Sequence, residues 1–271
     1  MLGINTFGIS HLLKKDFDGT VTKLRVMGIT SFEPCVVMTQ AFGRLRRLFY
    51  RIGFGVSGLD GGNWFGEKNY YRMIDRTEEL GVNVLSVHCA LCDGSPVVFD
   101  KMLSDIVDMF VLRPRIINFV VSLNLKSKKR ADKFIPVLNN FIKVISSKAN
   151  LIYHNHDSEI KSGTLDYLMS AVPELGLELD TGWAAFAGAD PLEIAEKYAE
   201  RLKAIHLKDF AFATDRKSFV PVGDGILPLK EVVGFAMRRG VPLILDEDKS
   251  KDMFGDIAKS IENIRKYTDK V

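Results

Sequence analysis

The fold is decided by four short segments, LIYHNHD (151–157), LGLELDTGW (175–183), LKAIHLKDF (202–210) and VPLILDEDKS (241–250). Each holds an aliphatic run too short for a helix and ends in a polar side chain, as a buried parallel strand does when it delivers a functional group at its carboxyl end. The end residues are His154, Asp180, His206 and Asp246. They lie 26, 26 and 40 residues apart, room each time for a strand, a crossover helix and two loops. We therefore expect four successive βα units that bring two imidazoles and two carboxylates around one point.

Strand-like segments also occur in the first half of the chain. The eight expected strands cover residues 2–7, 29–34, 82–88, 116–122, 150–155, 176–181, 203–208 and 242–247. Amphipathic stretches lie between the later strands, and one of them, LKEVVGFAMRRG, ends in Gly240, where a helix needs its carboxyl-terminal cap. Eight such alternations predict an α/β fold, a (β/α)8 TIM barrel, rather than a doubly wound sheet. Because the sequence shows no internal repeat, low-complexity tract or linker, we expect a single domain over residues 1–271.

Composition excludes several other classes of protein. A chain of 271 residues with 46% hydrophobic content can bury one large core. The formal net charge of +3 does not call for nucleic acid as a partner. There is no run of 18 apolar residues, and the first ten residues lack the regions of a signal peptide, so we expect a soluble cytoplasmic protein without a membrane partner. Three cysteines, an odd number, do not make a disulfide framework and agree with a reducing compartment.

The widest gap between expected strands, residues 35–81, carries the glycine-rich and aromatic stretch FYRIGFGVSGLDGGNWFG (49–66). A loop of this length and composition is typical of a lid, and we predict that residues 50–67 form a mobile cover over the working face. The alternative is a surface excursion that packs on a partner subunit. In either case a homodimer or homotetramer is the expected assembly.

Six motifs follow one another between about residues 150 and 250: YHNHDSEI (153–160), LELDTGW (177–183), GADP (188–191), IHLKD (205–209), PVGDG (221–225) and LILDEDKS (243–250). Together they resemble the motifs of the sugar phosphate isomerase/epimerase family, the xylose-isomerase-like TIM barrels of the endonuclease IV superfamily fold. Looser matches are ITSFEP (29–34) and LSVHC (85–89). The resemblance implies a divalent metal ion at the ends of the fifth to eighth strands, over which a sugar or polyol is isomerised, epimerised or dehydrated.

The resemblance also implies which residues hold the metal. Asp180 and His206 match the Asp and His ligands of the family directly, and Asp246 stands where the family usually has Glu. On the fifth strand many members have Glu where this chain has His154. Glu159, five residues further on, is therefore an alternative fifth-strand ligand, with His154 preferred. Imidazole and carboxylate ligands suit one Mn, Zn, Co or Mg ion, and the sequence does not choose among them.

Further polar residues near the strand ends are candidates for proton transfer and for substrate contact. A carbon acid needs a base within hydrogen-bond reach, and an imidazole whose lone pair binds metal cannot be that base. The candidate proton carriers are Glu159, Lys208 and Asp248. The candidate substrate-binding residues are His88, His156 and Trp183. For His88 and Trp183, packing in the core is the alternative interpretation.

These features lead to a functional hypothesis with an open alternative. We expect a metal-dependent sugar or sugar-phosphate isomerase or epimerase that acts through an enediolate intermediate. The alternative is a lyase of the inosose-dehydratase or 3-keto-glycoside-cleaving type, in which the same intermediate expels a leaving group. A nuclease of the endonuclease IV type is less favoured, because a trinuclear zinc site needs more ligands than five histidines and their neighbours supply. A barrel that binds a sugar without converting it is the non-catalytic alternative.

Overall fold

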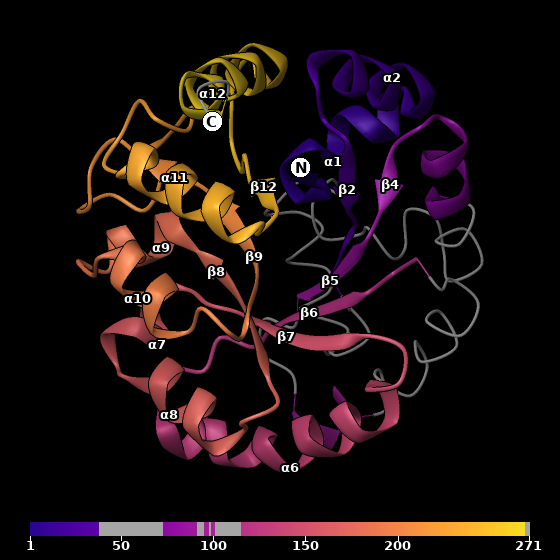
Figure 1. Cartoon of the computed structure of the whole chain (residues 1–271). Coiled ribbons are helices and arrows are strands. Elements are labelled where there is room, and N and C mark those ends of the chain that lie inside the picture. The colour runs from indigo at the N-terminus through magenta and orange to yellow at the C-terminus, as the bar shows by residue number, and fades with distance from the viewer. Residues whose placement is uncertain (38–72, 91–94, 98, 101–114, 269–271) are drawn as a thin grey trace, which may run out of the picture.

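The computed structural model describes residues 1–37, 73–90, 95–97, 99–100 and 115–268. The expected cover at residues 50–67 lies outside the described residues. In the described part, helices form an outer ring around a central set of strands (Figure 1). The carboxyl ends of these strands all face one end of the ring, because neighbouring strands pair in parallel.

The central strands form a closed parallel barrel. They are β1 (Leu2–Asn5), β2 (Ser31–Glu33), β3 (Cys35–Val37), β4 (Asn83–Val84), β5 (Ser86–Ala90), β6 (Asn118–Ser122), β7 (Asn150–His154), β8 (Gly176–Asp180), β9 (Leu202–Leu207) and β12 (Leu243–Leu245). Pro34 alone separates β2 from β3, and Leu85 alone separates β4 from β5. Because β2 pairs with β4 and β3 pairs with β5, these ten described strands occupy eight positions and the barrel closes. The predicted (β/α)8 TIM barrel is confirmed.

The helices of the described residues pack around the outside of the barrel. Those with complete bounds are α1 (Thr6–Lys15), α2 (Phe17–Met27), α6 (Lys128–Ile145), α7 (Asp157–Lys161), α8 (Thr164–Ala171), α9 (Thr181–Phe186), α10 (Pro191–Lys197), α11 (Leu229–Arg239) and α12 (Met253–Thr268). Residues 73–79 are helical as well. Helix α11 ends at Gly240, which adopts a left-handed conformation with a φ of 66°, as the sequence predicted. Among the described residues, no helix has the length and apolar character needed to cross a membrane.

Alternation along the strands separates the hydrophobic core from the barrel interior. In β8, Leu177 and Leu179 belong to the hydrophobic cluster beneath the helices, whereas Glu178 and Asp180 contact polar side chains of other strands. Successive side chains of a strand point to opposite faces, so these two acids share the inner face. The inner face of this barrel is therefore rich in ionisable groups, and these groups are buried.

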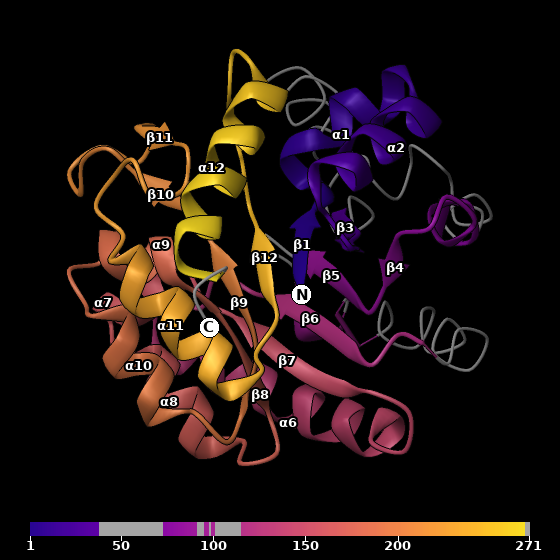
Figure 2. The ribbon, with the colours of Figure 1, turned by 45° about the horizontal axis from the view of Figure 1, so that its top comes forward.

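A small hairpin lies at the carboxyl end of the barrel. Its strands are β10 (Asp209–Phe210) and β11 (Phe219–Val220), and Figure 2 shows it at the end toward which the arrows of β1 and β12 point. The Asp209 carboxylate accepts hydrogen bonds from four backbone N–H groups, those of residues 210, 223, 225 and 227. This one carboxylate therefore fixes the loop that contains the PVGDG motif.

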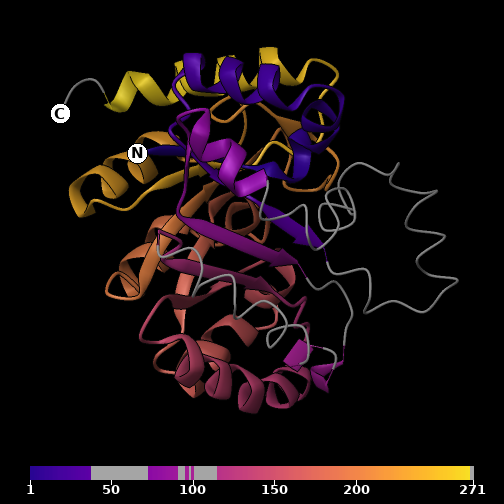
Figure 3. The same cartoon turned by 90° about the vertical axis from the view of Figure 1, so that its right-hand side faces the viewer.

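The two ends of the described chain meet on one side of the barrel. Helix α12 lies beside α1 and α2 (Figure 3), and the Arg265 guanidinium donates a hydrogen bond of 2.9 Å to the Met27 carbonyl. The last strand, β12, pairs with the first, β1. The barrel is thus complete only when its last βα unit has docked.

Candidate metal centre and active site

The structure brings the four expected metal ligands together. His154 Nε2 lies 3.6 Å from Asp180 Oδ2, and His206 Nδ1 lies 3.4 Å from Asp246 Oδ2. Ligand atoms of Asp180, His206 and Asp246 all lie within 4.8 Å of one another. All four side chains are buried, at 7% exposure or less. Asp180, His206 and Asp246 therefore converge, and His154 adjoins them through Asp180. We call these four residues the outer cluster.

The residues of the outer cluster fit a divalent cation. Asp180 Oδ1 accepts a hydrogen bond from the Trp183 N–H and caps helix α9, but Asp180 Oδ2 is buried without a hydrogen-bond partner. A buried polar atom without a partner is costly, which marks this oxygen as a position for a ligand. Burial raises the pKa of the Asp180 carboxyl to about 6. A set of nitrogen and oxygen donors of this kind suits a divalent first-row metal or magnesium.

Lys208 places an ammonium group among these carboxylates. Its Nζ lies 2.7 Å from Asp246 Oδ2, 2.8 Å from Asp248 Oδ2 and 3.8 Å from Asp180 Oδ2. Burial alone would lower the pKa of Lys208, but the three carboxylates raise it well above its ordinary value. Conversely, Lys208 and His206 hold the pKa of Asp246 below its ordinary value against the effect of burial. Two of the candidate proton carriers, Lys208 and Asp248, therefore lie at the cluster as a charged pair.

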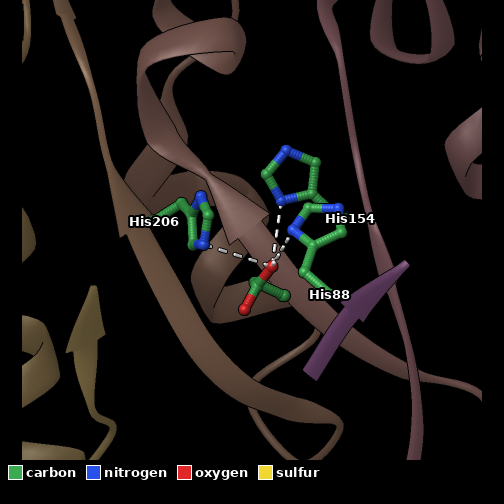
Figure 4. Close-up of side chains that lie close together, drawn as sticks. His88, His154 and His206 are labelled. Carbon is green, nitrogen blue, oxygen red and sulfur yellow. Dashed lines mark hydrogen bonds and ion pairs between the residues drawn. The ribbon is translucent and has the colours of Figure 1, made fainter. Parts of the chain in front are cut away.

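Two further acids lie deeper in the barrel, and the sequence analysis missed both. Glu178 Oε2 is 2.9 Å from His154 Nδ1, and Glu33 Oε1 is 2.9 Å from His206 Nε2. In Figure 4 the imidazoles of His88, His154 and His206 point toward one another, and dashed lines join each of them to one carboxylate oxygen, Glu178 Oε2. One available signal was the position of Glu178 two residues before Asp180, on the same face of its strand.

The surroundings of the two deeper acids shift their pKa values in opposite directions. The Glu33 carboxylate accepts hydrogen bonds from Asn5 Nδ2 at 2.8 Å and Ser86 Oγ at 2.6 Å. Burial opposes ionisation of Glu33, but His206 and His88 hold its pKa well below the ordinary value. Burial, reinforced by the nearby charge of Glu33, raises the pKa of Glu178 well above the ordinary value. The two histidines therefore favour ionisation of Glu33, whereas burial and the charge of Glu33 oppose ionisation of Glu178.

His88 belongs to this deeper layer. Its Nε2 lies 3.0 Å from Ser122 Oγ, and its Nδ1 lies 3.3 Å from both Glu33 Oε1 and Asn5 Nδ2. Its ring centroid is 4.7 Å from that of His154. These contacts satisfy both ring nitrogens within the barrel, and contact with substrate stays a prediction.

Glu159 lies apart from the outer cluster. It is fully buried, and its carboxylate accepts hydrogen bonds from Leu125 N at 2.6 Å, Tyr153 Oη at 3.1 Å and Ser158 Oγ at 2.8 Å. It also accepts a hydrogen bond of 3.3 Å from the N–H of His156, the residue that precedes α7. Its contacts account for its burial as a structural residue. The predictions that it is the base or the fifth-strand ligand gain no support from them.

Aromatic groups line one side of the cluster. The Trp183 ring packs against Phe210, with centroids 4.8 Å apart, and lies 6.1 Å from the His156 ring. The Lys208 ammonium is 5.2 Å from the Trp183 centroid, and the Arg216 guanidinium is 4.8 Å from it. Burial lowers the pKa of His156 to about 4, and its Nδ1 is buried without a hydrogen-bond partner. Trp183 and His156, both expected to contact substrate, thus lie beside the charged pair.

Comparison with known proteins agrees with this fold. A model of the xylose isomerase-like TIM barrel family matches residues 35–267. The chain belongs to this family. An inosose dehydratase of Bacillus cereus (strain AH820) is 31% identical over 121 residues, which span 37% of this chain and 41% of that protein. An inosose dehydratase of Clostridium botulinum (strain Eklund 17B / Type B) is 40% identical over 63 residues, 22% of this chain and 21% of that protein.

Solved structures extend the likeness over nearly the whole chain. A sugar phosphate isomerase/epimerase from Parabacteroides distasonis has a TM-score of 0.70 at 18% identity and covers 96% of this chain and 92% of that one. The 3-keto-D-glucoside 4-epimerase of E. coli has a TM-score of 0.64 at 12% identity and covers 98% of both chains. At these identities the likeness shows the fold. The sequence matches span about two-fifths or less of the dehydratases, so the activity of those proteins is not thereby shown for this chain.

Proposed function

We propose that this protein is a divalent-metal-dependent enzyme that converts a sugar or polyol-derived ketone through an enediolate intermediate. The observation that carries the proposal is the convergence of Asp180, His206 and Asp246, with His154 3.6 Å from Asp180 Oδ2, an oxygen that accepts no hydrogen bond. These residues would hold one Mn, Zn, Co or Mg ion. When bound, such an ion polarises the neighbouring hydroxyl and carbonyl oxygens of a sugar and makes the adjacent C–H more acidic.

Lys208 and Asp248 are the proposed proton carriers. Burial raises the pKa of Asp248, which makes its carboxylate a stronger base than an ordinary aspartate. The Lys208 ammonium, 2.8 Å away, is the corresponding acid. In this scheme Asp248 accepts the carbon-bound proton, and Lys208 delivers a proton to the oxygen or carbon that requires it. The wall formed by Trp183 would hold the apolar face of the sugar ring and keep water away.

The arrangement favours some outcomes of the enediolate over others. Among the described residues, one acid–base pair lies at the outer cluster, whereas epimerisation by direct deprotonation and reprotonation uses carriers on opposite faces of the substrate. A single pair can instead remove a proton and protonate a departing hydroxyl, which is a lyase reaction. The matches to inosose dehydratases support this outcome, and we propose the lyase reaction first. Isomerisation, in which one carrier moves a proton between neighbouring carbons, is the second candidate.

Turnover in deuterated water would test the proposed reaction. The protein, reconstituted with Mn²⁺, Zn²⁺, Co²⁺ or Mg²⁺, would be incubated with ketoses, inososes and 3-keto-glycosides. We expect metal-dependent exchange of a substrate C–H with solvent deuterium. A lyase would also release a dehydrated or cleaved product, whereas an isomerase would yield a second sugar of the same mass before exchange. If a sugar bound but none of its C–H groups exchanged with solvent deuterium, the protein would be a sugar-binding protein and not an enzyme of this kind.

The ligand set is tested by Asp180→Asn. Asparagine caps helices as well as aspartate, so α9 should keep its first hydrogen bond while the site loses one anionic ligand. We expect the folded variant to lose stoichiometric metal after dialysis, measured by elemental analysis, and His206→Ala to do the same. Asp190→Asn, at the equivalent cap of α10, is the matched control and should keep its metal. Full metal content in Asp180→Asn would place the site elsewhere.

A further inference from the structure

The two histidines of the outer cluster face it with different ring nitrogens. His154 directs Nε2 toward Asp180 and Nδ1 toward Glu178, at 3.6 and 2.9 Å. His206 directs Nδ1 toward Asp246 and Nε2 toward Glu33, at 3.4 and 2.9 Å. A neutral imidazole carries hydrogen on one nitrogen and a lone pair on the other, and only the lone pair binds a cation. The group behind each ring therefore decides which nitrogen is available.

We propose that Glu178 and Glu33 are positioning residues that impose opposite tautomers on His154 and His206. Glu178 accepts the Nδ1–H of His154 and leaves its Nε2 for the cation. Glu33 accepts the Nε2–H of His206 and leaves its Nδ1. The inference rests on the proposed metal site. A carboxylate behind a metal-bound imidazole fixes the ring, selects the tautomer and raises the basicity of the bound nitrogen.

The surroundings of both acids suit this task. Glu33 is anchored from two other strands, by Asn5 of β1 and by Ser86 of β5. Glu178 is rigidly spaced from Asp180, because both lie in β8. The four side chains of the two pairs are at most 3% exposed, so water does not reach them to replace a lost acceptor. Ring orientation is thus set by the barrel rather than by loops.

A different reading of the same residues is a second cation deeper in the barrel. Ligand atoms of His88, His154, Glu178 and His206 also lie within 4.8 Å of one another, and Glu178 Oε1 is buried without a hydrogen-bond partner. Such a cation would need Nδ1 of His154 or Nε2 of His206, the nitrogens that the proposed tautomers protonate. A neutral ring cannot offer both nitrogens as ligands, so the two readings predict different metal counts and different bound nitrogens.

The first experiment measures Zn²⁺ affinity by competition with a chelator. Glu178→Gln and Glu33→Gln keep the size of the side chain, remove its charge and can present an N–H to the ring, which favours the wrong tautomer. We expect each variant to bind zinc roughly 10–100-fold more weakly than the unmodified chain, the usual effect of losing such a partner. Ser122→Ala removes a buried hydrogen bond to His88, which is not a ligand in this scheme, and should stay within about threefold. Unchanged affinity in both Gln variants would overturn the inference while leaving the metal site intact.

The second experiment needs no variant and so does not depend on whether one folds. ¹⁵N NMR of the histidine rings in the zinc-loaded protein distinguishes metal-bound, protonated and free nitrogens. We expect one zinc per chain, with His154 bound through Nε2 and His206 through Nδ1. Binding of His154 through Nδ1, or two zinc ions per chain, would overturn the inference in favour of the deeper cation. If the unmodified chain bound no zinc or other divalent ion, both the proposed function and the inference about the tautomers would fail.

Discussion

At the scale of single residues, Lys208 is the side chain on which the charge of the outer cluster depends. Its ammonium contacts Asp246 and Asp248 and lies near Asp180, all within a buried site. Burying carboxylates without a compensating cation is costly, whereas a paired buried charge is tolerated. The Lys208 ammonium therefore offsets the negative charge of these carboxylates. A bound divalent cation would offset part of the same charge.

We predict that Lys208→Met destabilises the metal-free protein more than the metal-loaded one. Removing one partner of a buried ion pair costs about 3–5 kcal/mol, and a bound cation should restore part of that loss because it supplies positive charge to the same carboxylates. Urea unfolding in EDTA and in Mn²⁺ measures both values. Lys161→Met, which removes a half-exposed ammonium from Asp157, is the control and should show no such metal dependence. Equal losses for Lys208→Met in both buffers would contradict this prediction.

At the scale of elements, the strands were visible in the sequence because a buried parallel strand is a short aliphatic run. The four segments that carry His154, Asp180, His206 and Asp246 form β7, β8, β9 and β12, with Asp246 one residue beyond β12, and the structure brings these residues close to one another. Glu178 was not predicted because it lies inside β8, two residues before the strand end, and Glu33 was not predicted because it ends β2, outside the four segments that carry the expected ligands. Glu33 and His206 are 173 residues apart, and no local pattern connects them. Closure of the barrel makes them neighbours.

Glu159 in helix α7 is a candidate that the sequence suggested and whose contacts the sequence could not reveal. The spacing of Glu159 from His154 made it a candidate base, yet its carboxylate joins the segment after β6, through Leu125, to Tyr153 of β7. The sequence indicates that an acid is near the site, but it does not indicate which hydrogen bonds that acid already makes. Glu159 therefore links the segment after β6 to β7 through its hydrogen bonds.

We expect Glu159→Gln to lower the free energy of unfolding by about 1–3 kcal/mol, because a buried charge-assisted hydrogen-bond network is weakened. Metal content should be unchanged, and exchange of a substrate proton with solvent should stay within about threefold, since general-base catalysis is assigned to Asp248. Chemical unfolding, elemental analysis and the deuterium assay measure the three quantities. A loss of exchange by a factor of roughly 100 or more, with metal and fold retained, would instead make Glu159 the base.

At the scale of the whole molecule, stability depends on docking of the last βα unit. Strand β12 pairs with β1, and α12 reaches back to Met27 through Arg265. Between them lies Glu247, whose buried carboxyl accepts a hydrogen bond of 2.5 Å from Ser260 of α12. This acid follows Asp246 directly, but its carboxyl contacts α12 through Ser260. It therefore titrates within the contact that closes the barrel.

Glu247 should make the metal-free protein lose stability as pH rises from about 4.5 to about 7. Burial raises its pKa in the folded chain from 4.5 to about 7. Between these values the folded state binds more protons than the unfolded state, so stability falls with rising pH, and the loss is complete above pH 7. A shift of this size corresponds to roughly 3 kcal/mol.

Glu247→Gln keeps an acceptor for Ser260 and removes the titration. Its stability relative to the unmodified protein should therefore be higher by up to about 3 kcal/mol at pH 8 and nearly equal near pH 4.5. Urea unfolding in EDTA at both pH values measures this, with Glu200→Gln, at an exposed side chain, as the control. A stability difference that is the same at pH 4.5 and pH 8 would show that the substitution acts through packing and not through the proton.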